Sequence, residues 1–224
     1  MSTFAFRIGD AHIAYTGRDE GDLGAGADPE LVIERRRGVV DLPFVWARQV
    51  HGADVVVVDA ETSSGMEADA LVTTAPRVAL ATFTADCAPI GLVGQGPDGL
   101  VIAAVHGGWR GLVGGVVANA AATMRRLGAT EVAAAVGPSV HPECYAFSPA
   151  DLDYVASRLN DDVRATTRDG EPALSIPNAV RSALLSAGVR LVFDSSECTA
   201  CSPDFFSYRA RGEVERQAMV IWRE

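Results

Sequence analysis

The sequence contains no lysine, and all 19 of its basic residues are arginine. This absence excludes Schiff-base chemistry and the lysine of a P-loop, and it leaves arginine as the side chain for binding an anion. The formal net charge of −10 argues against general nucleic-acid binding, because a basic face that could neutralise phosphates is missing. We therefore expect no nucleic-acid partner.

Long apolar runs are missing as well. No stretch approaches the roughly 20 apolar residues of a membrane span. The first ten residues lack the charged start, apolar centre and cleavage site of a secretory signal peptide. We expect a cytoplasmic protein with no membrane partner, and the sequence identifies no protein partner. Only four cysteines are present, and without a secretion signal they are more typical of thiols or metal ligands than of a disulfide framework.

The length and the pattern of elements predict the fold class. The chain has 224 residues without a linker or an internal repeat, which predicts one domain over residues 1–224. Strand patterns outnumber helical patterns, and the two kinds do not segregate strictly along the chain. We therefore predict an α+β (mixed α/β) domain with mixed β-sheets covered by helices.

Apolar periodicity and turn signals give the approximate bounds of the elements. Helices are predicted over residues 28–38, 112–127, 148–159 and 176–187, two of them beginning at Asp28-Pro29 and Ser148-Pro149. Strands are predicted over residues 11–15, 44–50, 53–59, 70–74, 78–84, 90–93, 100–105, 131–136, 189–193 and 217–222. Four consecutive valines in the segment 53–59 suggest that this strand is buried on both faces.

Three segments carry residues typical of a reactive site. His51 ends the strand pattern at residues 44–50, Cys87 follows the strand at 78–84, and His106 ends the apolar run at 100–105. Because strand ends can gather into one cleft, we expect these side chains to lie together. Cysteine and histidine are suitable zinc ligands, and three protein ligands leave a fourth position open for water or substrate. The same set is compatible with copper.

Two alternatives use nearly the same residues. Cys87 could act as a nucleophile without any metal, activated by one of the two histidines and with Asp86 as the orienting group. Two arginines, Arg48 and Arg110, accompany candidate ligands, and Arg110 with Gly111 lies at the predicted start of a helix. The free N–H groups and the positive dipole end of a helix favour anions, so this segment predicts a site for a phosphate or a carboxylate.

A second group of possible ligands is less convincing as the main site. His141-Pro-Glu143 followed by Cys198-Thr-Ala-Cys201 is similar to the zinc signature of nucleobase deaminases. Glu197 stands where that signature has proline, and His141 falls in a predicted turn. We therefore do not place the active site there.

Several segments resemble the YfiH family, also called the laccase-domain or polyphenol oxidase family. The resemblance runs from about Ile13 to the C-terminus. It rests on the blocks Arg48–Gly52, Ala68–Thr73, Thr84–Pro89, His106–Gly111, Gly137–Tyr145, Cys198–Thr199, Phe206–Arg209 and Arg216–Gln217.

The resemblance implies a single-domain fold similar to that of CNF1-type toxins. It also implies a metal, usually zinc, at His51, Cys87 and His106, which would form the catalytic centre. Candidate supporting residues in the same blocks are Gln49, Asp86, Trp109 and Tyr145. The chain departs from the family in a shortened, acidic segment at residues 17–26, and in Tyr145-Ala146-Phe147, where the family has Tyr-Glu-Val.

Members of the family are described in two ways. One description is a copper-dependent polyphenol oxidase. The other is an enzyme that phosphorolyses adenosine, inosine, guanosine and methylthioadenosine and deaminates adenosine. A multicopper laccase needs a trinuclear cluster and a further copper, ligated largely by histidine, and four histidines cannot supply that set.

Phosphorolysis fits the residues better. It needs an anion site, which Arg48, Arg110 and Gly111 could form, and charge stabilisation at the ribosyl centre. Our hypothesis is a zinc-binding purine nucleoside phosphorylase of broad specificity with adenosine deaminase activity, acting on nucleoside and phosphate. The alternatives are a mononuclear copper polyphenol oxidase and a non-catalytic, zinc-stabilised accessory domain.

Overall fold

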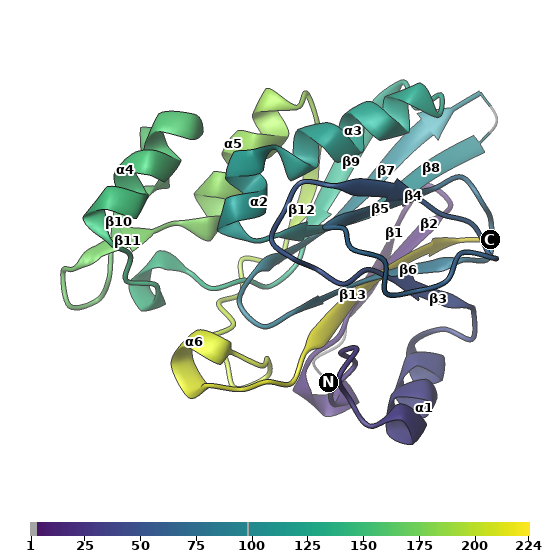
Figure 1. Cartoon of the computed structure of the whole chain (residues 1–224), viewed down its shortest axis with the longest axis horizontal. Helices are drawn as coiled ribbons and strands as arrows, with labels where there is room; N and C mark the ends of the chain where they lie inside the picture. Colours follow the sequence, from purple (N-terminus) through teal and green to yellow (C-terminus); the bar gives the residue numbers. More distant parts are fainter. Residues whose placement is uncertain (1–3, 98) are drawn as a thin grey trace.

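Two β-sheets pack face to face, and helices cover both outer faces (Figure 1). The computed structural model describes residues 4–97 and 99–224; Asp98, which falls in a predicted turn, lies outside them. The five-stranded sheet has the order β1 (Phe4–Ile8), β2 (Ala11–Tyr15), β13 (Gln217–Arg223), β6 (Ala79–Thr84) and β3 (Phe44–Trp46). The six-stranded sheet has the order β12 (Arg190–Asp194), β9 (Glu131–Val136), β7 (Ala88–Gly96), β8 (Gly99–Gly107), β5 (Ala70–Thr73) and β4 (Val55–Val57).

Both sheets are mixed. The pairs β3–β6, β4–β5 and β9–β12 are parallel, whereas the other pairs within the two sheets are antiparallel. A separate antiparallel pair joins β10 (Arg164–Thr166) and β11 (Pro172–Leu174). Mixed sheets covered by helices confirm the predicted fold class.

Apolar side chains fill the space between the sheets. Ile13, Leu80 and Ile221 of the five-stranded sheet belong to one buried cluster with Leu71 and Ile102 of the six-stranded sheet. The strands β5, β7 and β8 are apolar on both faces because helices cover the outer face as well. This double burial holds the strand ends in fixed positions.

The two sheets lie between α1 (Pro29–Val39) on one side and α2 (Trp109–Gly114), α3 (Val116–Arg126) and α5 (Ile176–Ser186) on the other (Figure 1). The outer face of the six-stranded sheet carries α2, α3 and α5, whereas α4 (Pro149–Arg158) packs against β11 and α2. The chain from α1 into β3 covers the five-stranded sheet, with the Arg36 guanidinium over the Trp46 ring at 4.1 Å. The remaining short helices are α6 (Tyr208–Arg211) and the 3-10 turns η1 (Arg18–Glu20), η2 (Pro142–Cys144) and η3 (Asp161–Val163). In the described residues, no helix is long and apolar enough to cross a bilayer.

Some predicted bounds are wrong, for physical reasons. The helix predicted over 112–127 begins earlier, at Trp109, and is interrupted at Gly115, whose φ of 88° is left-handed and ends α2 before α3 begins. The predicted strand at 53–59 shrinks to β4, an edge strand in which Val57 is 52% exposed, so its burial on both faces is wrong. The strands β1, β10 and β11 were not predicted.

The register of the β7–β8 hairpin brings two predicted site residues together. Pro89 pairs with His106 in this antiparallel pair, so Cys87, two residues before Pro89, lies beside the end of β8. On the other side of β8, Val105 pairs with Ala70, and the backbone N–H of His106 donates to the carbonyl of Asp69. One edge of the six-stranded sheet therefore collects residues that lie far apart in the sequence.

Gly137 follows β9 and is a position where only glycine fits. A Cβ atom there would lie 2.2 Å from the Tyr15 ring and 2.9 Å from Cγ of Pro89, and both rings are held in place. We expect Gly137→Ala to lower the free energy of unfolding by about 1–3 kcal/mol in urea denaturation. The control Gly38→Ala, in α1 with no atom within 4 Å of its Cβ, should retain or gain stability. Equal stability of the two variants would contradict the packing argument.

Candidate active site

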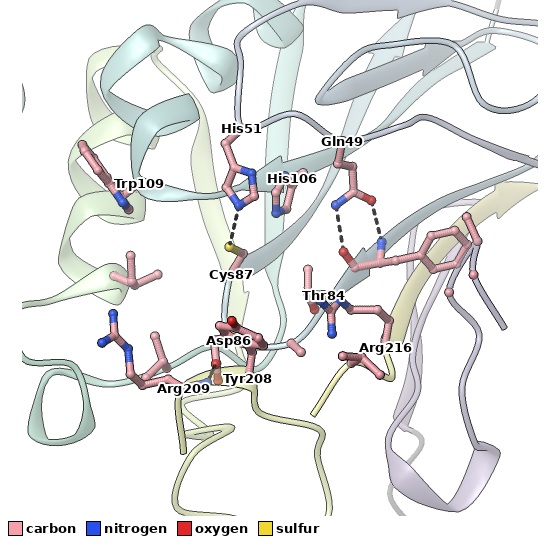
Figure 2. A pocket seen from close by; sticks show the side chains of 18 of the residues that line it. Gln49, His51, Thr84, Asp86, Cys87, His106, Trp109, Tyr208, Arg209 and Arg216 are labelled. Carbon is pink, nitrogen blue, oxygen red and sulfur yellow. Dashed lines mark hydrogen bonds between the residues drawn. The ribbon is translucent and has the colours of Figure 1, made fainter. Parts of the chain in front are cut away.

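A cavity of 740 Å³ opens where the ends of β6, β7 and β8 meet the loops before β4 and around α6 (Figure 2). This volume is in the range of small-molecule sites, roughly 300–1,000 Å³. All the predicted site residues except Gly111 line it. Gly111 is buried instead, because its Cα packs against the loop before β4, where a Cβ would lie 2.7 Å from the carbonyl oxygen of Gly52.

The three predicted ligands converge at this cavity (Figure 2). Sγ of Cys87 is 3.7 Å from Nε2 of His51, and the rings of His51 and His106 meet edge to face with centroids 4.8 Å apart. One ligand atom from each residue lies within 4.8 Å of the other two. The gathering of strand ends into one cleft is therefore confirmed.

A buried carboxylate shapes the turn that carries His51. Asp69 accepts hydrogen bonds from the backbone N–H groups of Val50 at 3.2 Å, His51 at 2.9 Å and Gly52 at 2.7 Å. The turn wraps around this carboxylate as a nest of backbone donors, and His51 takes a left-handed φ of 61°. The strained residue thus sits at the site, where such backbone conformations concentrate.

The same carboxylate fixes His106. Oδ1 of Asp69 is 2.7 Å from Nδ1 of His106, and both side chains are buried. When Nδ1–H donates to the carboxylate, Nε2 is left for the other two ligands or for a metal. Burial lowers the pKa of His106, but the Cys87 sulfur and the Asp69 carboxylate outweigh it and raise this pKa to about 9.

The thiol of Cys87 is activated by its neighbours. Burial raises its pKa, but His106 and His51 beside it have the larger combined effect and lower the pKa to about 6. The thiolate is the form that binds metals. Two imidazoles and a thiolate, one imidazole being held by a carboxylate, match the donor chemistry of a zinc site with an open position.

The backbone at Gly108 closes one side of this donor set. A Cβ there would lie 2.6 Å from Cδ2 of His51 and 3.5 Å from Sγ of Cys87. Only glycine allows the chain from β8 into α2 to pass so close to the ligands. The Gly-Gly-Trp-Arg segment therefore has a steric role at the site besides carrying Arg110.

Asp86 does not orient a histidine beside Cys87, which is the role that the sequence suggested for it. Its carboxylate accepts hydrogen bonds from the hydroxyls of Thr199 and Ser207 and from the backbone N–H of Arg209, each at 2.7 Å. These bonds hold α6 and the preceding segment against the cavity. The carboxylate that contacts a histidine of the site is that of Asp69.

The arginines at the cavity differ in their partners. Arg48 forms an ion pair with Glu67 on the surface. Arg110 lies over the Trp109 ring at 4.3 Å and Arg209 over the Tyr145 ring at 4.7 Å. Among the described residues, no carboxylate pairs with either of these two guanidinium groups, which leaves their N–H donors available to an anion.

Aromatic rings form one wall of the cavity. Trp109 meets Phe147 edge to face at 5.4 Å, and Tyr145 lies 5.5 Å from Phe147. Burial raises the pKa of Tyr145. On the opposite side, the side-chain amide of Gln49 exchanges two hydrogen bonds with the backbone of Phe83 (Figure 2). The amide thus pairs with β6 as the backbone of a neighbouring strand would.

Sequence reasoning did not select Asp69, Tyr208 or Arg209 as site residues. All three fall in blocks of the family resemblance, which was the signal available. Tyr208 and Arg209 line the cavity from α6, which the sequence pattern does not predict.

Residues 14–224 match the family model described as multi-copper polyphenol oxidoreductase laccase. A Streptomyces coelicolor protein named purine nucleoside phosphorylase is 36% identical over 236 residues, covering 96% of both chains. A Deinococcus radiodurans protein of the same name is 37% identical, covering 87% of this chain and 78% of its own.

Solved structures show the same fold. A Neisseria meningitidis protein of the DUF152 family superposes with a TM-score of 0.86 at 28% identity and covers all of both chains. YlmD from Geobacillus stearothermophilus superposes with a TM-score of 0.78 at 26% identity, covering 100% of this chain and 92% of its own.

Asp69→Asn should weaken metal binding without removing any of the three ligand side chains. The variant loses the negative charge that orients His106, and losses of this kind typically lower metal affinity about 10- to 100-fold. Competition with a coloured zinc chelator measures the change. The control is Asp59→Asn, an exposed carboxylate that also accepts backbone and hydroxyl bonds. Unchanged affinity in Asp69→Asn would refute the orienting role.

Proposed function

Because the chain belongs to the laccase-domain (YfiH) family and its relatives are named purine nucleoside phosphorylases, we propose that it cleaves purine nucleosides with phosphate. The products would be the free purine base and ribose 1-phosphate. The observation that supports this most directly is the cavity itself, which places Arg110 and Arg209, neither paired with a carboxylate of the described residues, beside an aromatic wall and the His51–Cys87–His106 set.

The arginines provide the phosphate site of the proposal. Arg110 and Arg209 present planar guanidinium groups whose donors match the geometry of phosphate oxygens. Arg48 and Gly111, also predicted for this site, contribute less in the observed arrangement. Arg48 would first have to break its ion pair with Glu67. Gly111 is buried against Gly52 and does not line the cavity.

The purine base would lie against the aromatic wall of Trp109 and Tyr145. Flat rings stack on aromatic side chains with little dependence on the base, which supports a broad specificity that includes adenosine, inosine, guanosine and methylthioadenosine. Phosphate held by the arginines would then approach the ribosyl carbon, where positive charge develops as the bond to the base breaks.

We propose zinc as the metal, held by His51, Cys87 and His106. When bound, the metal would supply a Lewis acid that polarises a substrate oxygen or lowers the pKa of a water for the deamination of adenosine. The protein contributes the fixed imidazole of His106, the low thiol pKa of Cys87 and the closed side at Gly108.

The competing function is oxidation of phenols at a single copper ion. The donor set of two histidines and a cysteine favours it, since copper accepts the same ligands. A multicopper cluster does not fit, because His12 stacks on Trp222 in the five-stranded sheet and His141 belongs to another group of side chains. Only His51 and His106 of the four histidines reach the cavity.

Incubating the purified protein with inosine and phosphate tests the proposal. Chromatography should detect hypoxanthine and ribose 1-phosphate in equal amounts, and neither product should form without phosphate. The protein loaded with zinc and the protein loaded with copper are compared, with phenol oxidation measured on both. Phenol turnover in the copper form with no phosphorolysis in either form would overturn the proposal.

Arg110→Ala and Arg209→Ala should each raise the KM for phosphate roughly 10- to 100-fold, the range of one lost charge-assisted hydrogen bond pair. Cys87→Ala should abolish turnover. The control Arg7→Ala removes an exposed arginine of β1 that pairs with Asp10, and its kinetics should match those of the wild type. A KM for phosphate that is unchanged in both cavity variants would place the phosphate elsewhere.

A further inference from the structure

A second group of side chains that can ligate a metal is separate from the His51–Cys87–His106 set in the cavity. Three of its members are cysteines: Cys144 ends η2, and Cys198 and Cys201 lie on the turn after β12. The other two members are His141 and Glu143. The three sulfur atoms lie within 4.8 Å of one another, and the same holds for one ligand atom each of His141, Glu143 and Cys198. All three thiols are free.

We propose that this group binds a second divalent ion of the zinc class, with Cys144, Cys198, Cys201 and His141 as ligands. Cys198 belongs to both sets of neighbouring atoms, so three thiolates and one imidazole would together supply four protein ligands, which is the pattern of a structural zinc site. Oε1 of Glu143 lies 3.8 Å from Nδ1 of His141, where a carboxylate can orient the imidazole. This inference does not depend on the proposed function.

Burial raises the pKa of all three thiols, and nearby donors oppose this effect at two of the sulfur atoms. The backbone N–H of His141 donates to Sγ of Cys198 at 3.4 Å. The guanidinium of Arg168, in the loop between β10 and β11, donates to Sγ of Cys201 at 3.1 Å. Hydrogen bonds to a charged acceptor are stronger than neutral ones, so both contacts stabilise the thiolate form that a metal requires.

A disulfide accounts for less of this arrangement. Sγ of Cys144 and Sγ of Cys201 are 3.2 Å apart, and joining them would use only two of the five side chains and would require an oxidant. The buried Cys198 would be left unused, and His141 and Glu143 would have no part. A cation uses the third sulfur and the imidazole as well.

The position of the group suggests what the ion does. Cys144 is followed by Tyr145 of the aromatic wall, and Cys198 is followed by Thr199, whose hydroxyl donates to Asp86. Arg168 comes from the loop of the β10–β11 hairpin and contacts the group through Cys201. The ion would join the two segments that carry its ligands behind the cavity wall, and its ligands leave no open position for a substrate.

Metal content of the purified protein tests the inference. Mass spectrometry of the wild type grown with zinc should find one zinc ion per chain more than in Cys201→Ser or Cys198→Ser grown in the same way. The control Ser202→Ala changes the neighbouring hydroxyl, which accepts from the N–H of Asp204, and should keep the zinc content of the wild type. Equal zinc in Cys201→Ser and the wild type would overturn the proposal, as would a Cys144–Cys201 disulfide in the zinc-grown wild type.

Cobalt provides a second test that does not require the cluster variants to fold. In Cys87→Ser, every remaining thiol belongs to the proposed site. Adding Co²⁺ to the metal-free form of this variant should produce intense sulfur-to-cobalt charge-transfer absorption that saturates at one ion per chain. Absence of that absorption would refute the second site whatever the activity of the enzyme.

Discussion

The buried carboxylate of Asp69 is the group on which the geometry of the cavity depends. Placing a charge inside a protein is costly unless hydrogen bonds replace its hydration. Three backbone N–H groups and Nδ1 of His106 do so here. One carboxylate therefore sets the path of the chain at His51 and the orientation of His106, and the two imidazoles hold their relative positions through it.

The position of Asp69 is in turn a result of strand register. It precedes β5, whose antiparallel pairing with β8 sets it opposite His106, while the β7–β8 hairpin sets Cys87 at the same edge. A shift of one residue in either pair would turn side chains to the other face of the sheet. The buried faces of β5, β7 and β8 oppose such a shift, so the apolar core also holds the ligand geometry.

The sequence predicts those parts of this arrangement that depend on local chemistry. The helix starts at Asp28 and Ser148 were predicted from capping residues, and both side chains accept the expected backbone hydrogen bonds. The ligands at strand ends were predicted from residue type. The sequence does not show whether Asp69 or Asp86 is the carboxylate that contacts His106, because that depends on which strands pair and in which register. The edge position of β4 depends on the same pairing.

The lack of lysine has a consequence for how the cavity can hold an anion. An ammonium group is a strongly hydrated point charge on a flexible chain, whereas a guanidinium is planar and stacks on aromatic rings. Arg110 over Trp109 and Arg209 over Tyr145 use that property, so the wall that would hold a purine also positions two cations. Stacking occupies the faces of the guanidinium groups, and no carboxylate of the described residues pairs with their N–H edges. An acidic protein can thus present a local site for phosphate without a basic surface.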